Sequence, residues 1–315
     1  MYGSAAAHVK WFTDPRPYPT DYSLLLTAPV IAAVAIALVA IAAAALVQRR
    51  LPEPHIFRSL ERFAGLGPLV LGVHVGLALL VAAAVGWLFV PALVVERDAL
   101  GVAILITEGA CGLMLALGLG TRVAAVALAL LGIVAMQPFS FESILEQVHI
   151  LGAATFLFIV GRGAASLDQL VRQHRALRHE LAPAAALALL RIAMGVGITF
   201  EALTEKLLDP ALGAAFLAER PYVNVLAGLG VSNGQFVYLA GLAELVIGTM
   251  VVSGQLTRPV MAVGAVLFTI TLPLFGWREL VGHLPYFGIM FTLFIAPNAD
   301  TGRVRRQLRE GIVAA

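Results

Sequence analysis

Long apolar stretches, separated by short groups of charged residues, prolines and glycines, make up most of the chain. Each stretch has about 18 to 26 residues with few charges, enough for a helix to cross a hydrocarbon core about 30 Å thick. The pattern predicts nine transmembrane helices, at about 23–48, 65–90, 99–119, 121–138, 142–161, 183–208, 235–256, 258–275 and 279–297. We therefore expect an all-α integral membrane protein.

One fifteen-residue pattern occurs twice in the apolar part of the chain. E-G-A-C-G-L-M-L-A-L-G-L-G-T-R begins at Glu108, and E-L-V-I-G-T-M-V-V-S-G-Q-L-T-R begins 136 residues later at Glu244. A second pair, G-V-H-V-G at 72–76 and R-I-A-M-G at 191–195, has an offset of only 119, so the second copy carries 17 additional residues. These residues fall near 211–234, where we expect a lid over the outer mouth. An internal duplication with an even number of spans per unit gives parallel repeats.

The duplication and the loops predict the organisation of the chain. The expected parts are an extracytoplasmic segment (1–22), a leading helix (23–48), a first four-helix bundle (65–161), a basic cytoplasmic linker (162–182), a second four-helix bundle (183–297) and a cytoplasmic tail (298–315). Alternating the spans collects most arginines on one side, which is typical of the cytoplasmic face. The N-terminus is then outside, where Trp11 and Phe12 are expected to anchor the first segment at the membrane interface.

Composition supports the membrane assignment and excludes some chemistry. Hydrophobic residues make up 60% of the chain and charged residues 13%, unlike a soluble domain. A single cysteine, Cys111, excludes an internal disulfide and a C-x-x-C redox pair. The net charge is only +2, and the basic linker is expected to bind anionic lipid rather than nucleic acid. We expect a multi-pass protein of a bacterial or archaeal-type plasma membrane.

The candidate functional residues are ionisable side chains inside the predicted spans. Such groups are costly in a bilayer and usually indicate a function. Glu201 and Glu205 lie four apart, on one face of a predicted helix, and Lys206 follows at its outer rim. Glu279 and His283 are also four apart. The other candidates are Glu108, Glu142, Glu146, His149, Arg191 and Glu244.

Several interpretations of these groups remain open. They can act as structural ion pairs between helices, or line a site where glutamate and histidine exchange protons with a quinone. Glu142, Glu146 and His149 form one stripe, and Glu-x-x-His is half of the motif that carboxylate di-iron bundles use on two helices. A metal ion is therefore an alternative, although only one such motif is present. A small-molecule carrier built on repeats is a further alternative.

The second unit resembles the DoxX/DoxD-like membrane proteins. The resemblance lies in L-L-R-I-A-M-G-V-G-I-T-F-E-A-L-T-E-K-L at 189–207 and in the repeated pattern that follows it. The matching positions are Arg191, Gly195, Lys206, Glu244, Gly248, Thr257 and Arg258. The first unit keeps Glu108, Gly112, Thr121 and Arg122, but has Gly72, Ala82, Gly86 and Trp87 where the second has Arg191, Glu201, Glu205 and Lys206. The resemblance implies four-helix modules that take part in membrane redox work, including quinone reduction by a thiosulfate oxidoreductase.

Together these features predict a quinone-linked redox component that works as a subunit with protein partners and the quinone pool. Its polar pocket opens to the outer face in the second unit. Glu205 and Glu244 are expected to accept protons, with Lys206 as their charge partner. The expected quinone-binding residues are Arg191, Glu201, Glu279 and His283. The alternative is a non-catalytic membrane scaffold or assembly subunit, because no sequence motif for haem, flavin or nucleotide is evident.

Overall fold

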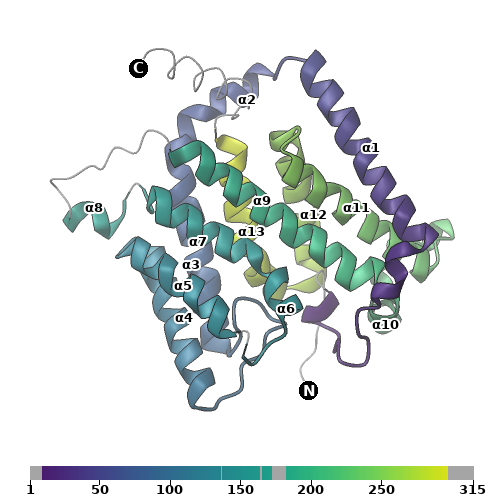
Figure 1. Cartoon of the computed structure of the whole chain (residues 1–315), viewed down its shortest axis with the longest axis horizontal. Helices are drawn as coiled ribbons and strands as arrows, with labels where there is room; N and C mark the ends of the chain where they lie inside the picture. Colours follow the sequence, from purple (N-terminus) through teal and green to yellow (C-terminus); the bar gives the residue numbers. More distant parts are fainter. Residues whose placement is uncertain (1–8, 136, 164, 172–181, 297–315) are drawn as a thin grey trace.

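The structure is a computed structural model that describes residues 9–135, 137–163, 165–171 and 182–296 (Figure 1). Its α-helices are α1 (Ala28–Arg50), α2 (His55–Leu60), α3 (Gly67–Val85), α4 (Ala99–Leu117), α5 (Thr121–Ala135), α6 (Phe141–Glu146), α7 (Val148–Val160), α8 (Leu167–Val171), α9 (Ala182–Ala202), α10 (Pro210–Glu219), α11 (Asn233–Ser253), α12 (Thr257–Phe275) and α13 (Trp277–Ile295). Short 3₁₀ turns η1 (Val9–Trp11), η2 (Tyr22–Leu26), η3 (Glu61–Leu66), η5 (Pro221–Val223) and η6 (Ala227–Leu229) and one π-helical turn, η4 (Leu203–Leu207), complete the elements. The described residues form no β-strand beyond one isolated bridge, which confirms the all-α fold.

Six helical stretches in the described part of the chain are long and apolar enough to cross a membrane. They are Ala28–Arg50, His55–Val85, Ala99–Leu117, Ala184–Leu207, Asn233–Ser253 and Thr257–Phe275. This finding supports a multi-pass membrane protein but does not confirm nine spans. Helices α5 and α7 are apolar but shorter, and the predicted helix at 142–161 is divided into α6 and α7. Part of the predicted linker, 172–181, and the predicted tail lie outside the described residues.

The two predicted units contain matching helix pairs in close contact. A Cβ atom added to Gly112 would lie 2.8 Å from the carbonyl oxygen of Gly76, and one added to Gly195 would lie 2.7 Å from the carbonyl oxygen of Gly248. These glycines let α3 approach α4, and α9 approach α11, to backbone contact. Small residues at an interface are the usual means of packing helices in membranes. The duplicated sequence pattern therefore corresponds to duplicated contacts.

The fourth helix of each unit packs on the first helix of the other unit. Helix α7 lies along α9, and α13 lies along α3. A Cβ atom on Gly152 of α7 would meet the Ala193 side chain at 2.3 Å, and one on Gly288 of α13 would meet the His74 side chain at 3.0 Å. These two contacts join repeat-equivalent positions. The two sets of four helices are thus interlocked through α7 and α13, the second of which is largely buried.

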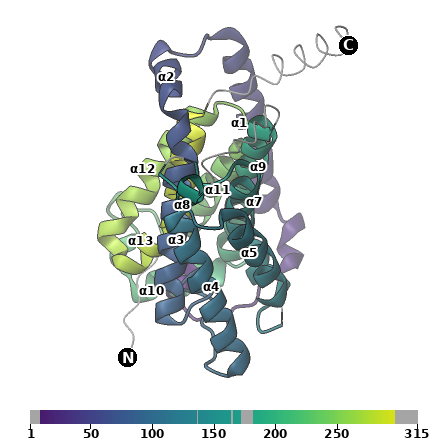
Figure 2. The same cartoon turned by 90° about the vertical axis from the view of Figure 1, so that its left-hand side faces the viewer.

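The leading helix α1 lies at one edge of the molecule and packs against α11 (Figure 1). Its buried residues are Val30, Ala33, Ala37 and Ala44, which form one stripe of mostly small side chains. The rest of its surface is exposed and apolar, which suits contact with lipid. Turned by 90°, the molecule shows the α1–α2 connection at one end and the α3–α4 connection at the other (Figure 2). Residues 9–27 therefore precede α1 at the end opposite α2.

Candidate functional site

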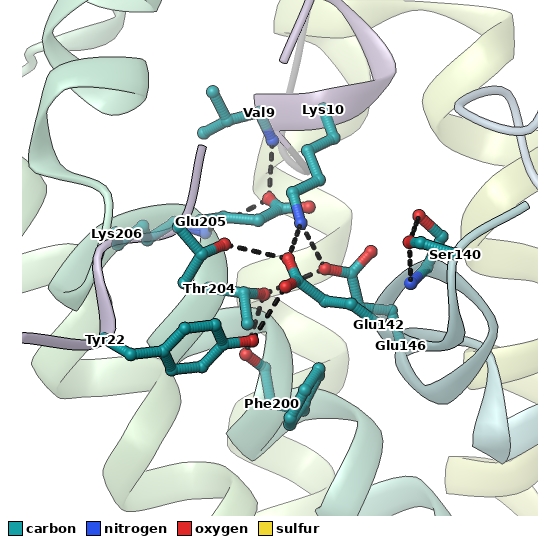
Figure 3. Close-up of polar contacts among 12 residues, drawn as sticks. Val9, Lys10, Tyr22, Ser140, Glu142, Glu146, Phe200, Thr204, Glu205 and Lys206 are labelled. Carbon is teal, nitrogen blue, oxygen red and sulfur yellow. Dashed lines mark hydrogen bonds and ion pairs between the residues drawn. The ribbon is translucent and has the colours of Figure 1, made fainter. Parts of the chain in front are cut away.

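The polar side chains of both units meet where the N-terminal segment 9–22 enters the helices (Figure 3). The first unit contributes α6 and the start of α7. The second contributes the end of α9, η4, α11 and α13. Among the buried charged or polar residues are Glu146, His149, Glu201, Glu205, Lys206, Glu279 and His283. We call this set, together with Lys10, Glu142, Glu244 and Tyr286, the polar core.

The π-helical turn η4 presents the central charges. It widens the end of α9 over Leu203–Leu207 and buries Thr204, Glu205 and Lys206 as consecutive residues. The N–H of Leu208 donates to the carbonyl oxygen of Leu203 at 2.8 Å, which is the i→i+5 hydrogen bond of a π-turn. Wider π-turns inside helices are frequent at functional sites. The spacing of acidic residues in the sequence did not reveal this turn.

Lys206 lies between the two carboxylates that were predicted to accept protons, Glu205 and Glu244. Its Nζ lies 2.8 Å from Glu244 Oε2 and 3.8 Å from Glu205 Oε2. Lys206 and Glu205 are almost fully buried, whereas the Glu244 side chain is 32% exposed. Buried ion pairs lose solvation and become unfavourable when one partner is removed. The structure thus brings together Glu205, Lys206 and Glu244, the three predicted proton-handling residues.

Lys10 from the N-terminal segment supplies a second ammonium group. Its Nζ lies 3.0 Å from Glu142 Oε1 and also forms an ion pair with Glu146. The backbone N–H of Val9 donates to Glu205 Oε2 at 2.8 Å. Burial alone would lower the pKa of Lys10, but the charges of Glu146 and Glu205 raise it above its ordinary value. Lys10 is therefore a fixed positive charge between carboxylates of both units.

The same segment is bound to α6 through three hydrogen-bond donors, all of which donate to the carboxylate of Glu142. Glu142 accepts from Lys10, from Thr20 Oγ1 at 2.8 Å and from Tyr22 Oη at 2.7 Å (Figure 3). Burial would raise the pKa of Glu142, but the hydrogen bond from Tyr22 and the charge of Lys10 lower it below its ordinary value. The N-terminal segment is therefore a bound part of the site.

Trp11 and Phe12 correct one expectation from the sequence. They were predicted to anchor at the membrane interface, but only 5% and 6% of their surfaces are exposed. The Trp11 ring lies against His283, with ring centroids 5.5 Å apart, and occupies the space that a Cβ atom on Gly282 would need. Burial of these aromatic rings inside the protein outweighs the interfacial preference of tryptophan.

Deeper in the site, a tyrosine connects the two units. Tyr286 Oη donates to Glu201 Oε1 at 2.9 Å, and its ring stacks on His149 at a centroid distance of 4.0 Å. His283 stacks on Phe268 at 4.2 Å, and its Nδ1 lies 3.5 Å from Glu279 Oε1. The predicted quinone-binding residues Glu201, Glu279 and His283 thus lie in the polar core.

An apolar cavity of about 1030 Å³ adjoins the charged turn. Its walls come from the start of α1, from η4 and from α11, and the insert 211–234 adds the edge near Val231. Lys206 is the charged side chain in this wall, and Gln235 and Tyr238 are its other large polar residues. The remaining lining residues are Leu24, Thr27, Pro29, Val30, Leu207, Pro210, Gly230, Gly234 and Leu239. Apolar walls with a few fixed polar groups are typical of small-molecule sites.

Arg191 lies away from the polar core, in a structural position. It lies fourteen positions before Glu205, which is about 21 Å along a helix. Its guanidinium donates to the carbonyl oxygens of Val251 and Val252 at the end of α11. In the first unit Arg162 donates to the equivalent carbonyl, that of Ala116, and fills the space beside Gly72. Both arginines therefore satisfy the final carbonyls of a helix.

Glu142, Glu146 and His149 were predicted as metal ligands. In the structure the carboxylates of Glu142 and Glu146 both form ion pairs with Lys10. In the described residues no group of three or more His, Cys, Asp or Glu side chains is arranged to hold a metal ion. The metal site stays a prediction from the sequence.

Family models, characterised proteins and solved structures give no match to this chain. The resemblance to DoxX-like modules therefore stays a prediction. Sequence reasoning missed Lys10 and Tyr286 of the polar core, and it also missed Thr204, whose Oγ1 donates to Glu146 Oε1 at 2.8 Å. The unusual mixture of basic and aromatic residues at 8–12 was the available signal for the first, but the contacts of Thr204 and Tyr286 depend on long-range packing.

Proposed function

We propose that the protein is a quinone-binding subunit of a membrane redox complex, with the quinone head in the apolar cavity beside Lys206. The observation that carries this proposal is a roughly 1030 Å³ apolar cavity with a single ammonium in its wall, bound to two carboxylates. A quinone is an apolar ring with two carbonyl acceptors. An ammonium can donate to one carbonyl, while the apolar walls hold the ring and its tail.

Reduction of a quinone to a quinol consumes two electrons and two protons, and each O–H bond of the product needs one proton. In this proposal the Lys206 ammonium gives its proton to the reduced quinone and is reprotonated through Glu205 and Glu244, and the partly exposed Glu244 takes up the replacement protons from water. Cys111 is the single cysteine, so the chain forms no dithiol. The two electrons come, in this proposal, from an electron-donor protein bound to the complex. Lys206, Glu205 and Glu244 are thus the proposed proton-handling residues.

The cavity allows a steric test that leaves the charges intact. Gly234 lines the cavity, and a Cβ atom added there would meet nothing within 4 Å. Gly234→Leu should therefore fill cavity space without disturbing the fold. Gly132→Leu on α5 is the matched control, because its added Cβ also meets open space but lies outside the cavity lining.

Equilibrium dialysis of the detergent-purified protein against a short-chain ubiquinone measures the effect. We expect the wild type and Gly132→Leu to bind alike, and Gly234→Leu to bind at least about tenfold more weakly, as loss of about 1.4 kcal/mol implies. Equal binding by all three proteins, or no binding by any, would contradict the proposal.

The alternative function is a non-catalytic scaffold, and one observation favours it. The buried ammonium and guanidinium groups of Lys10, Lys206 and Arg258 each contact at least two carboxylates. Charges that are paired in this way are able to hold helices together without any further function. In that case deletion of the protein would remove partner subunits from the membrane, and a Lys206→Met/Glu244→Leu variant that keeps those subunits would also keep the redox activity of the complex.

A further inference from the structure

The arginine that ends each copy of the repeated pattern has a different environment in the two units. Arg258, in the second unit, is 1% exposed and lies 2.6 Å from Glu53 Oε1 and 2.9 Å from Glu61 Oε1. It also donates to the carbonyl oxygen of Ala296 at 2.6 Å. Two carboxylates and a carbonyl thus occupy its guanidinium. This arginine has an entirely internal role.

Arg122, at the equivalent position of the first unit, has one acceptor. Its Nε donates to the carbonyl oxygen of Phe158 at 3.0 Å, and no carboxylate in the described part of the chain pairs with it. Asp168, on the neighbouring turn, accepts from the backbone N–H groups of Gly120 and Thr121. The terminal nitrogens of Arg122 therefore keep donors for which the described residues supply no acceptor.

An apolar groove of about 430 Å³ starts at this guanidinium. Its walls are Arg122, Val123, Val126, Ala127 and Leu130 of α5 together with Phe158 of α7. The α5 residues follow the spacing of one helix face, so the groove runs along the helix for about 10 Å. Val123 and Leu130 are 66% and 57% exposed. The groove is therefore open at the exposed surface of α5.

We propose that Arg122 and this groove bind one anionic phospholipid. The guanidinium binds the phosphate, and the first part of an acyl chain lies along Val123, Val126 and Leu130. A planar guanidinium with free donors matches a phosphate oxygen pair, and basic pockets between membrane helices are suited to anionic headgroups. The apolar groove beside it favours an anion with an attached acyl chain over a purely polar anion. This proposal is independent of the quinone cavity, which lies in the other unit.

Native mass spectrometry of the whole protein tests the site, with phosphatidylglycerol and phosphatidylcholine of identical acyl chains as probes. The variants are Arg122→Gln, Arg122→Lys and Val126→Trp, the last of which fills the groove. Arg49→Gln is the control, because Arg49 is an exposed arginine at the end of α1. Its neighbour Gln48 accepts from the N–H of Leu256, the repeat equivalent of Gly120, so both arginines occupy the same end of the helices.

The wild type should retain one phosphatidylglycerol in preference to phosphatidylcholine. Arg122→Gln should lower that preference about fivefold, the effect of one basic residue at a membrane surface, and Arg122→Lys should restore part of it. Val126→Trp should lower retention of the lipid with Arg122 intact, whereas Arg49→Gln should retain it. Equal losses in Arg122→Gln and Arg49→Gln would show a general charge effect and overturn the proposal. Displacement of the lipid by glycerophosphoglycerol alone, at equal concentration, would show a simple phosphate site and also overturn it.

Discussion

Glu108 and Glu244 occupy equivalent positions in the repeated pattern, yet their surroundings differ. Glu108 is fully buried, and one of its oxygens accepts the backbone N–H of Phe89 at 2.6 Å. The other oxygen has no hydrogen-bond partner. Glu244 is partly exposed and forms an ion pair with Lys206, which lines a cavity. The first unit keeps its carboxylate without a cation, and the second adds a cation and space for a ligand.

The segments that close the two units account for this difference. In the first unit the loop after α3 folds inward and buries Leu88, Phe89 and Val90, with Phe89 at a positive φ of 65°. Trp87, at the position of Lys206, stacks on Trp277 at 5.3 Å. In the second unit the N-terminal segment closes the site with polar contacts, through Val9 to Glu205 and through Lys10 to Glu142 and Glu146. Hydrophobic closure thus favours a structural role for the first unit, and polar closure favours ligand exchange in the second.

Removal of the Lys206 ammonium should have the largest effect. Lys206→Met leaves Glu205 buried without its neighbouring cation, and breaking a buried pair in this way should lower the free energy of unfolding by about 3 kcal/mol. Thermal unfolding in mild detergent measures the change. A Lys206→Met/Glu244→Leu variant should recover part of the loss. A single variant as stable as the wild type would show that the ion pair does not hold the second unit.

The glycine contacts test whether the two units are packed alike. Gly112→Ala and Gly248→Ala each place a Cβ atom less than 3.0 Å from backbone atoms of the facing helix, so the helices must move apart. Each should lower the unfolding free energy by about 2 kcal/mol, the usual cost of overpacking. Gly109→Ala is the control on α4, because its nearest atom would be Ala83 Cβ at an ordinary 3.4 Å. A large loss in only one of the two variants would contradict equivalent packing.

Neutral replacement of the two equivalent glutamates separates structure from function. Glu108→Gln keeps an acceptor for Phe89 and should change the unfolding free energy by less than about 1 kcal/mol, with quinone binding unchanged. Glu244→Gln removes the charge beside Lys206 and should slow quinone reduction by the intact complex. Assays of both variants in the same membranes make the comparison. Equal loss of reduction in both would show that the function is not confined to the second unit.

Local patterns in the sequence were sufficient for the all-α fold and for part of the site, whereas the nine predicted spans are not confirmed. Apolar length predicted the helical regions, and i,i+4 spacing placed Glu201 with Glu205 and Glu279 with His283. The duplication singled out Glu244 by its match to Glu108, and the structure places its carboxylate beside Lys206. These features depend on short-range periodicity and on the repeat, both of which are visible in one chain.

Features that depend on long-range packing were not predictable. The insertion of Lys10 between Glu142 and Glu146 joins residues more than 130 positions apart, and no local pattern encodes that contact. The packing of α7 on α9 and of α13 on α3 is a further example. The helical periodicity of the sequence would be the same if the two units were separate bundles. Arg191 was assigned to the quinone site on its charge, whereas the carbonyls of Val251 and Val252 determine its position.

The smallest expected effect is the loss of stability at acidic pH that comes from Glu142, which binds the N-terminal segment. Because the folded-state pKa of Glu142 is lowered, its contribution to stability is complete above its unfolded pKa, about 4.3, and is lost as the pH falls through the lower folded value. The Glu142 side chain is 25% exposed, so the contribution should stay below about 1 kcal/mol. Thermal unfolding between pH 3 and 6, a range about the ordinary carboxyl pKa, should show a smaller decrease on acidification for Glu142→Gln than for the wild type. Tyr22→Phe removes one of the three donors and should give an intermediate decrease. Identical pH profiles for all three proteins would mean that Glu142 does not hold the segment, and the polar closure of the second unit would then rest on Glu146 and Glu205.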